Sequence, residues 1–305
     1  MTFITLTLSP AIDVHCEAET FVAGQENLAT VTDRDAGGKG VNISRALHAY
    51  GLESTCLVAL GEENGKELAD ALVRDGLSLF PIRVPGRVRE NITVHVKGGK
   101  ETRLSFQTAP APADLMMHVS AMTEPLCTQD TVLTLTGRVP HGVSLDLVKA
   151  YVRRAQGYGV RVVIDSRSFS LADLLEVRPF LIKPNEEEIA AYTGQPIRTA
   201  EEALAAARDL HGRGIENVMI SLGGAGAVLS CDGGDFAVSA PRVQPISTIG
   251  AGDSAIAGFL AALAEGKGPA DCLRTAIAFG SAACLTPGTR PPRKADILRL
   301  LTEIA

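Results

Sequence analysis

The sequence predicts an α/β fold in which helices cover both faces of a mainly parallel sheet. Short apolar runs that suit buried strands alternate with segments whose apolar residues recur at helical spacing, as is typical of such sheets. The apolar runs are residues 3–8, 54–60, 131–136, 160–165, 179–183 and 217–222. The helical segments are residues 41–50, 64–75, 143–157, 186–193, 199–213, 253–264, 268–285 and 293–304.

Two segments interrupt this alternation. Residues 10–35 are polar and extended in character, and residues 88–106 alternate apolar and polar side chains around Gly98-Gly99, as a β-hairpin does. We expect these segments, about 10–35 and 88–108, to pair as a small β-sheet that stands off the main sheet as a lid. Neither a linker nor an internal repeat divides the chain, so residues 1–305 are predicted to form one domain that carries this lid.

Composition excludes several classes of partner. The chain has 305 residues, 46% hydrophobic and 21% charged, which suits one α/β domain with an appendage. A net charge of −6 without basic runs argues against nucleic acid. Neither an 18-residue apolar run nor a basic leader occurs, so we expect no membrane span and a cytoplasmic protein. The six cysteines form no C-x-x-C pair, which favours reduced thiols without a metal.

Residues 247–253 read Ser-Thr-Ile-Gly-Ala-Gly-Asp and lead directly into a helical segment. Gly250, Ala251 and Gly252 leave their backbone N–H groups open at the positive end of that helix, where an anion binds favourably. Asp253 would repel an anion that bound passively, but it suits a base that takes a proton from an attacking hydroxyl during phosphoryl transfer. The pattern predicts a kinase, and the alternative is a tight turn with Asp as a helix cap.

A second glycine-rich segment, residues 35–51, also precedes a helix. Gly38 comes just before Lys39, Asn42 lies in the first helical turn, and Gly51 suits the position after the helix. A helix N-terminus with a lysine suits a bound phosphate. The chain has neither a G-x-x-x-x-G-K-[ST] segment nor a protein-kinase catalytic loop with its Asp-Phe-Gly, so these nucleotide-binding classes are excluded.

Four ordered motifs together resemble the ribokinase-like PfkB carbohydrate kinases. They are Gly37-Gly-Lys-Gly40, Lys183-Pro-Asn-Glu-Glu-Glu188, Ser221-Leu-Gly-Gly-Ala-Gly226 and Gly250-Ala-Gly-Asp253. The similarity covers nearly the whole chain and is greatest to the sugar-phosphate branch, which contains 1-phosphofructokinases, tagatose-6-phosphate kinases and the minor 6-phosphofructokinase. The resemblance implies a ribokinase-like three-layer α/β/α fold with a small β-sheet lid.

On the ATP side, the resemblance implies a role for each motif. Asp253 matches the family's general base, and the glycine run 250–252 matches its anion hole for the transferring phosphoryl group. Asn185 and Glu188 match the family's N-x-x-E, which organises Mg²⁺ through water; the alternative is a first helical turn rich in carboxylates. The residues implied to bind ATP are Lys183, Asn185, Glu188, Ser221, Gly223, Gly226 and Gly280. A hairpin into residues 227–230 is compatible with that role.

On the acceptor side, the resemblance implies that Asp13 holds sugar hydroxyls and that Arg89 and Asn91 lie on the lid. Lys39 together with Arg89 could clamp a phosphate already on the acceptor, which a kinase of unphosphorylated sugars does not need. A solvated charge on an edge strand is the alternative for Arg89. The residues assigned to the acceptor are Asp13, Gly38, Lys39, Asn42, Arg89, Asn91 and Arg138.

Three arginines lie where the chain departs from the family pattern. Arg138 and Arg167 follow the predicted strands 131–136 and 160–165, at the edge where parallel sheets bind ligands. We expect Arg138, and Arg167 with it, to contact the acceptor or the ATP phosphates; the alternative is that each pairs with a nearby carboxylate. Arg103 also departs from the 1-phosphofructokinase pattern, which leaves the exact sugar open.

These observations predict Mg²⁺- and ATP-dependent phosphorylation of a ketohexose phosphate, first of all fructose 1-phosphate to the 1,6-bisphosphate. The rivals are tagatose 6-phosphate, fructose 6-phosphate and an unphosphorylated sugar, while a nucleoside is disfavoured by 4% aromatic residues and no Trp. A sugar-phosphate sensor is the non-enzymatic rival, although a sensor needs no base such as Asp253. From the family we also expect a homodimer through the lid.

Overall fold

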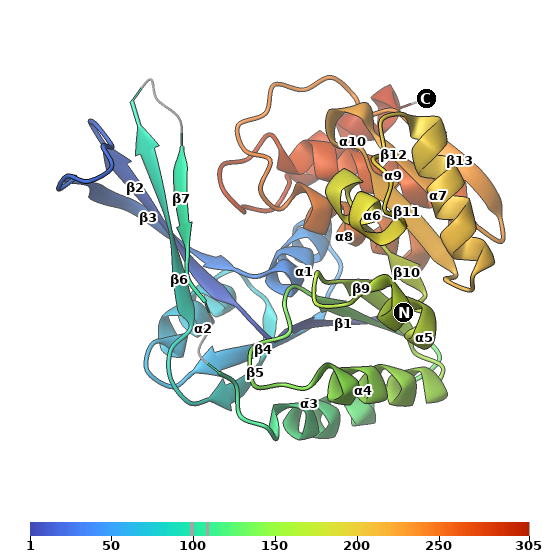
Figure 1. The fold of residues 1–305 in the computed structure, drawn as a ribbon, viewed down its shortest axis with the longest axis horizontal. Helices are drawn as coiled ribbons and strands as arrows, with labels where there is room; N and C mark the ends of the chain where they lie inside the picture. Colours follow the sequence, from blue (N-terminus) through green and yellow to red (C-terminus); the bar gives the residue numbers. More distant parts are fainter. Residues whose placement is uncertain (98–100, 108–109, 305) are drawn as a thin grey trace.

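The structure, a computed structural model, describes residues 1–97, 101–107 and 110–304 (Figure 1). Its strands are β1 (Thr2–Thr7), β2 (Ala11–Ala18), β3 (Thr30–Gly37), β4 (Thr55–Gly61), β5 (Ser78–Val84), β6 (Arg89–Val96), β7 (Thr102–Ser105), β8 (Thr131–Thr136), β9 (Arg161–Asp165), β10 (Leu181–Ile182), β11 (Asn217–Ser221), β12 (Ala227–Cys231) and β13 (Gly234–Val238). Its α-helices are α1 (Lys39–Tyr50), α2 (Gly65–Arg74), α3 (Leu115–Thr123), α4 (Leu145–Gly157), α5 (Leu171–Val177), α6 (Glu186–Thr193), α7 (Ala200–Gly212), α8 (Ala251–Ala264), α9 (Pro269–Ala283) and α10 (Lys294–Glu303).

The central sheet has the strand order β13-β12-β11-β10-β9-β8-β1-β4-β5. The seven neighbouring strands β11-β10-β9-β8-β1-β4-β5 run parallel to one another. Strands β12 and β13 continue the sheet, each antiparallel to its neighbour. Helices lie on both sides of the sheet (Figure 1), which gives the predicted three-layer α/β/α arrangement. In the described part of the chain, no helix combines the length and the apolar character needed to cross a bilayer.

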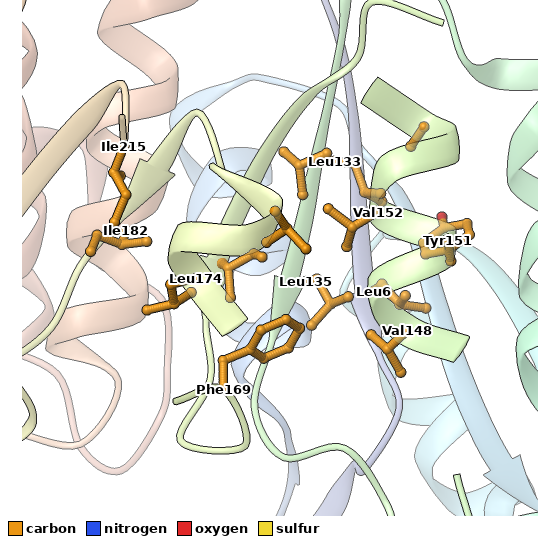
Figure 2. Packing of buried hydrophobic residues seen from close by; sticks show 14 of the residues in the cluster. Leu6, Leu133, Leu135, Val148, Tyr151, Val152, Phe169, Leu174, Ile182 and Ile215 are labelled. Atoms are coloured by element: carbon orange, nitrogen blue, oxygen red, sulfur yellow. The ribbon is translucent and has the colours of Figure 1, made fainter. Parts of the chain in front are cut away.

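Side chains that alternate along the inner strands fill two cores, one on each face of the central sheet. In β1, Ile4 and Leu6 face the core formed with α3, α4, α5 and α7, whereas Phe3 faces the core formed with α1, α8, α9 and α10. Figure 2 shows the first core, where Leu6, Leu133 and Leu135 of the sheet pack against side chains of α4 and α5. Strands buried on both faces explain the continuous apolar runs in the sequence.

A second, small sheet has the strand order β3-β2-β6-β7 and stands off the central sheet (Figure 1). Strand β2 pairs antiparallel with β3 and parallel with β6, and β6 pairs antiparallel with β7. In β2, Asp13, His15 and Glu17 alternate with Val14 and Cys16, so one face of the small sheet is polar. The other face packs near β4 and α2 in a third core.

Most of this architecture agrees with the sequence prediction. Each predicted apolar run contains a strand, each predicted helical segment contains a helix, and the two interrupting segments pair as expected. The Gly98-Gly99 turn and residue 108 lie outside the described residues. The prediction omitted β5, α3, α5 and β13, because β5 carries Pro81 and Arg83, α5 has only seven residues, and β13 is a half-exposed edge.

Candidate active site

A cleft of about 400 Å³ lies where the carboxyl ends of the parallel strands meet the polar face of the small sheet. This edge is where open parallel sheets bind ligands. The predicted residues that line it are Asp13, Gly38, Lys39, Asn42, Arg89, Asn91, Lys183, Asn185, Glu188, Gly250, Gly252 and Asp253. Residues that are far apart in the sequence therefore share one cavity.

Asp253 is buried in the first turn of α8, beneath the glycine run. Gly250 caps the helix in the left-handed region at φ 80°, a conformation that glycine adopts without strain. The Asn42 amide donates a hydrogen bond to Asp253 Oδ2 at 2.8 Å. Burial raises the pKa of Asp253 to about 6, although Lys39, Asn42 and Lys183 each oppose the rise.

Helix α8 is held in place by close packing against α9. A Cβ at Gly258 would lie 2.6 Å from the Thr275 carbonyl oxygen and 2.8 Å from the Phe279 ring, so only glycine permits this approach. The predicted ATP residue Gly280 belongs to the same contact, since a Cβ there would lie 3.2 Å from the Ala251 carbonyl oxygen. Backbone packing thus fixes the N-terminus of α8 that carries Asp253.

Two lysines and a buried aspartate lie beside Asp253. Lys39 Nζ donates to Asp165 Oδ2 at 2.9 Å, and Lys183 Nζ lies 4.0 Å from the same oxygen. Burial would lower the pKa of Lys39, but Asp165, Asp253 and Glu188 outweigh it and raise that pKa. The Lys183 ammonium also approaches the glycine run, because a Cβ at Gly252 would lie 2.9 Å from Nζ.

Asn185 and Glu188 form a capping box at the start of α6. The Glu188 N–H donates to Asn185 Oδ1 at 2.9 Å, and Glu188 Oε2 accepts from the Asn185 N–H at 3.1 Å. Arg167 donates to Glu188 Oε1 at 2.8 Å and also pairs with Glu187. The alternative foreseen for Arg167, an ion pair with a nearby carboxylate, is thus observed; Arg167 also lines the cleft, and its contact with the acceptor or the ATP phosphates stays a prediction.

The donor set in the described residues suits a hydrated Mg²⁺ better than a directly ligated one. No group of three His, Cys, Asp or Glu side chains is placed there to hold a metal ion. Both carboxylate oxygens of Glu188 already accept hydrogen bonds, which disfavours direct ligation of a cation and leaves their remaining lone pairs for water. Mg²⁺ commonly keeps several waters and takes its other ligands from phosphates, which agrees with the predicted indirect role.

The small sheet contributes the opposite wall of the cleft. Asp13 Oδ1 accepts hydrogen bonds from Asn91 Nδ2 at 2.8 Å and from Arg103 Nη2 at 2.9 Å. Arg89 lines the cleft with a buried Nε that has no hydrogen-bond partner among the described residues. Burial lowers the pKa of Arg89, and the positive charges of Arg138 and Arg103 lower it further, whereas the Asp13 carboxylate raises it.

Other predicted site residues lie outside the cleft lining. Arg138 is exposed, and its positive charge contributes to lowering the pKa of Arg89. Ser221 forms a β-bridge with Asn185, next to the cleft. Gly223 and Gly226 lie in the turn between β11 and β12, where a Cβ at Gly226 would overlap the Val238 carbonyl oxygen. The hairpin into residues 227–230 is confirmed, and the ATP-binding roles of these residues remain predictions.

Two charged residues of the cleft lining, Asp165 and Arg103, have no role predicted from the sequence. Asp165 is the counter-ion of both lysines, and Arg103 is the partner of Asp13. Asp165 could have been found as a carboxylate that ends a buried parallel strand. Arg103 had no such signal, because its position depends on how β7 pairs with β6.

A buried carboxylate under a glycine-rich helix N-terminus, with lysines beside it and arginines opposite, defines a small-molecule kinase. The chain belongs to the pfkB family of carbohydrate kinases, whose model matches residues 4–296. It is 34% identical to the 1-phosphofructokinase of Haloferax volcanii, over 99% of this chain and 97% of that protein. It is 33% identical to the 1-phosphofructokinase of Rhodobacter capsulatus, over 98% of this chain and 96% of that protein.

Solved structures agree with this assignment. Phosphofructokinase-2 from Escherichia coli, in complex with substrates and products, matches with a TM-score of 0.93 and 26% identity, covering 99% of both chains. The ribokinase of Arabidopsis thaliana, complexed with ribose and ATP, matches with a TM-score of 0.76 and 24% identity over 98% of both chains, a likeness of fold. The ribokinase-like fold and the family, with its transfer of phosphate to an alcohol, are thus confirmed.

Replacing Asp253 with Asn should stabilise the folded protein at pH 8. The pKa of about 6 lies above the usual 3.8, so the native state binds this proton more tightly than the unfolded chain does. The free energy of unfolding therefore falls as the pH rises from about 4 to about 6, by up to about 3 kcal/mol. The asparagine side chain carries no charge, so we expect Asp253→Asn to raise the free energy of unfolding by about 1–3 kcal/mol at pH 8.

Urea denaturation at pH 8, 6 and 4.5 measures this effect, and the advantage of Asp253→Asn should shrink toward the lowest pH. The control is Asp209→Asn on α7, where an exposed aspartate pairs with Arg213 and should show no comparable gain. An Asp253→Asn protein that is less stable than the wild type at pH 8 would contradict the destabilising effect of burying this charge.

Proposed function

We propose that this protein transfers the γ-phosphate of ATP to a hydroxyl of a ketohexose phosphate, and that fructose 1-phosphate is its main acceptor. The observation that carries the proposal is the buried Asp253 carboxylate at the N-terminus of α8, facing an acceptor wall that carries Asp13, Asn91 and Arg89. The 1-phosphofructokinase names of relatives at 33–34% identity support the choice of acceptor.

Asp253 is the base in this proposal. Its pKa of about 6 leaves it mostly ionised at neutral pH, and it remains basic enough to accept a proton from the attacking hydroxyl. The Asn42 amide orients the carboxylate by donating to Oδ2. The Ala251 N–H already donates to the Thr248 carbonyl oxygen at 3.4 Å, so we assign the stabilisation of the negative charge on the transferring phosphoryl group to the N–H groups of Gly250 and Gly252 at the start of α8.

The lysines neutralise charge beside the base. Lys39 was expected to clamp the acceptor's phosphate, but its contact with Asp165 places it beside Asp253. We therefore assign Lys39, together with Lys183, to the transferring group and leave the acceptor's phosphate to Arg89. Mg²⁺ bound with ATP supplies further charge neutralisation, and Glu188 and Asn185 would hold it through water.

The small sheet serves as the lid over the acceptor in this proposal. Its polar face forms the wall of the cleft opposite Asp253, so an acceptor lies between the base and Asp13. Covering the acceptor excludes bulk water, which favours transfer to the sugar over hydrolysis of ATP. Fructose 6-phosphate is the second candidate acceptor, because phosphofructokinase-2, whose structure matches closely, was solved in complex with it.

Coupled measurement of ADP release tests the proposal. Mg²⁺-ATP is offered with fructose 1-phosphate, tagatose 6-phosphate, fructose 6-phosphate or free fructose. We expect the highest kcat/KM with fructose 1-phosphate, and a loss of about 10²- to 10⁴-fold in kcat for Asp253→Asn. A preference for free fructose would contradict the phosphosugar assignment, and the absence of turnover with all four acceptors would favour a sensor.

We further propose that two copies associate through the small sheets. Val31 and Leu104 lie on the same face as Cys16 and Ile92 but are half-exposed, and Leu28 in the neighbouring loop is 85% exposed. Apolar side chains on edge strands favour pairing with another chain, and a second copy offers the matching surface. Phosphofructokinase-2 has been solved in a tetrameric form, which supports self-association in this family.

Sedimentation velocity tests the dimer. We expect a dimer for the wild type and a monomer for the double variant Val31→Asp and Leu104→Asp, because the charges would be buried in the interface. Leu147→Asp on α4, at a similarly exposed position, should remain dimeric. A wild-type monomer at concentrations well above those of the assay would contradict association through the small sheet.

A further inference from the structure

Four polar side chains cross the carboxyl edge of the central sheet in one row. The register of β8 with β9 pairs Thr136 with Asp165. The registers on either side, continued by one residue, add Thr7 of β1 and Lys183 after β10. Side chains at paired positions of parallel strands lie on the same face of a sheet. The apolar side chains further down this face belong to the core that α1 and α8 cover, so the polar row lies beneath the start of α1, where Lys39 contacts Asp165.

The two threonines of this row carry hydroxyl groups without a hydrogen bond. Thr7 is 1% and Thr136 is 3% exposed, and neither Oγ1 has a partner among the described residues. Lower on the same strands and the same face, the hydroxyls of Thr5 and Thr134 are both bonded, the second to the Ile4 carbonyl oxygen at 3.5 Å. A buried hydroxyl without a partner destabilises a fold, and an apolar side chain of the same shape does not. Packing alone therefore gives no reason for a hydroxyl at either edge position.

Thr136 lies beside a buried carboxylate whose cationic partners are the two lysines of the cleft. Asp165 Oδ2 accepts from Lys39 at 2.9 Å and lies 4.0 Å from Lys183 Nζ. Burial would raise the pKa of Asp165, but the charges of Lys183 and Lys39 outweigh it and lower that pKa. In the proposed function the same lysines contact the transferring phosphate, so their bonds to Asp165 weaken when ATP binds. A buried carboxylate that loses its donors is destabilised unless other donors replace them.

We infer that Thr136 is a positioning residue for phosphoryl transfer. Its hydroxyl donates to Asp165 once the two lysines turn to the ATP phosphates, and Thr7 donates in turn to Thr136 Oγ1. The inference rests on the proposed function and adds two residues to it. Neighbouring strands lie about 4.8 Å apart, a spacing that paired threonine and aspartate side chains can span. A hydroxyl both donates and accepts, so this chain of hydrogen bonds satisfies both threonines at once.

This exchange lets the lysines leave Asp165 without leaving a buried charge unpaired. The threonine hydroxyls have no partner in the ligand-free protein and are bonded in the ATP complex, so they favour the bound state over the free one. A group that is better satisfied in the bound state raises the affinity for the ligand by the difference between the two states. A threonine with a purely structural role would show no such difference, because its hydroxyl would be equally well bonded in both states.

Ligand binding and thermal unfolding of the same variants test the inference. Isothermal titration calorimetry measures the affinity for a non-hydrolysable analogue of ATP in the presence of Mg²⁺, without acceptor, and calorimetric unfolding of the ligand-free protein measures the Tm. We expect Thr136→Val to raise the Tm by about 2–5 °C, because it removes an unsatisfied hydroxyl. The same variant should bind the analogue about 10- to 100-fold more weakly, because Asp165 then has no donor that replaces the lysines.

Three further variants complete the comparison. Thr136→Ser keeps the hydroxyl and should bind the analogue within about threefold of the wild type. Thr7→Val should also raise the Tm but weaken binding less than Thr136→Val does, because it acts through Thr136. The matched control is Thr134→Val, on the same strand and face, which removes a hydroxyl that is bonded to the Ile4 carbonyl oxygen. Its Tm should not rise, and its affinity for the analogue should equal that of the wild type.

The outcomes separate this inference from the proposed function. If the wild type phosphorylates fructose 1-phosphate but Thr136→Val binds the analogue normally, the inference fails and the proposed function stands. A Tm that falls together with the affinity in Thr136→Val, or a Thr136→Ser protein that binds as weakly as Thr136→Val, also overturns the inference. If Thr136→Val loses affinity, Thr136→Ser restores it and the wild type transfers phosphate to none of the four acceptors, the inference stands and the proposed acceptor fails. A wild type that does not bind the analogue overturns both.

Discussion

The site depends on a carboxylate that is kept charged while buried. Removing the Asp253 carboxylate from water is unfavourable, and this desolvation raises its pKa to about 6. The Asn42 amide, Lys39 and Lys183 oppose the rise, so the group stays ionised at neutral pH. The Asn42 hydrogen bond also fixes the orientation of the carboxylate, which lines the cleft.

This constraint explains why the fold around Asp253 is so closely packed. Helix α8 approaches α9 through Gly258, where a side chain would overlap the Thr275 carbonyl. The lysines that neutralise the carboxylate are themselves held by Asp165 at the end of β9. A parallel sheet brings these distant residues together, because its strands all end at the same edge. The parallel topology of the sheet therefore brings together the charged residues of the site.

Much of the fold and of the site could be predicted from the sequence. Buried parallel strands leave continuous apolar runs, and the glycine run before Asp253 marks a helix N-terminus that is open to an anion. What could not be predicted depends on pairing between distant segments. The Asp13–Arg103 contact requires the register of β6 with β7, and the Lys39–Asp165 contact requires the strand order that brings β9 beside the start of α1.

Side chains at and near the start of α6 combine structural contacts with positions in the cleft lining. Arg167 pairs with Glu188 at the start of α6 and also lines the cleft. Asn185 and Glu188 form a capping box that would be favourable in any helix, and they also line the cleft. Helix capping and a place in the cleft lining thus coincide at the start of α6, and sequence alone does not separate them.

Whether Asp253 is the base, tuned by its neighbours, is best decided by the pH dependence of kcat/KM with fructose 1-phosphate for the wild type and Asn42→Ala. The acid limb should report the Asp253 base with an apparent pKa near 6, although the sugar's phosphate titrates in the same range. Comparing the two proteins separates these groups, because the substrate is identical. Asn42→Ala loses a hydrogen bond that lowers the pKa of Asp253, so its limb should move to higher pH. A limb at the same pH in both proteins, with kcat/KM reduced equally at every pH, would contradict this role for Asp253.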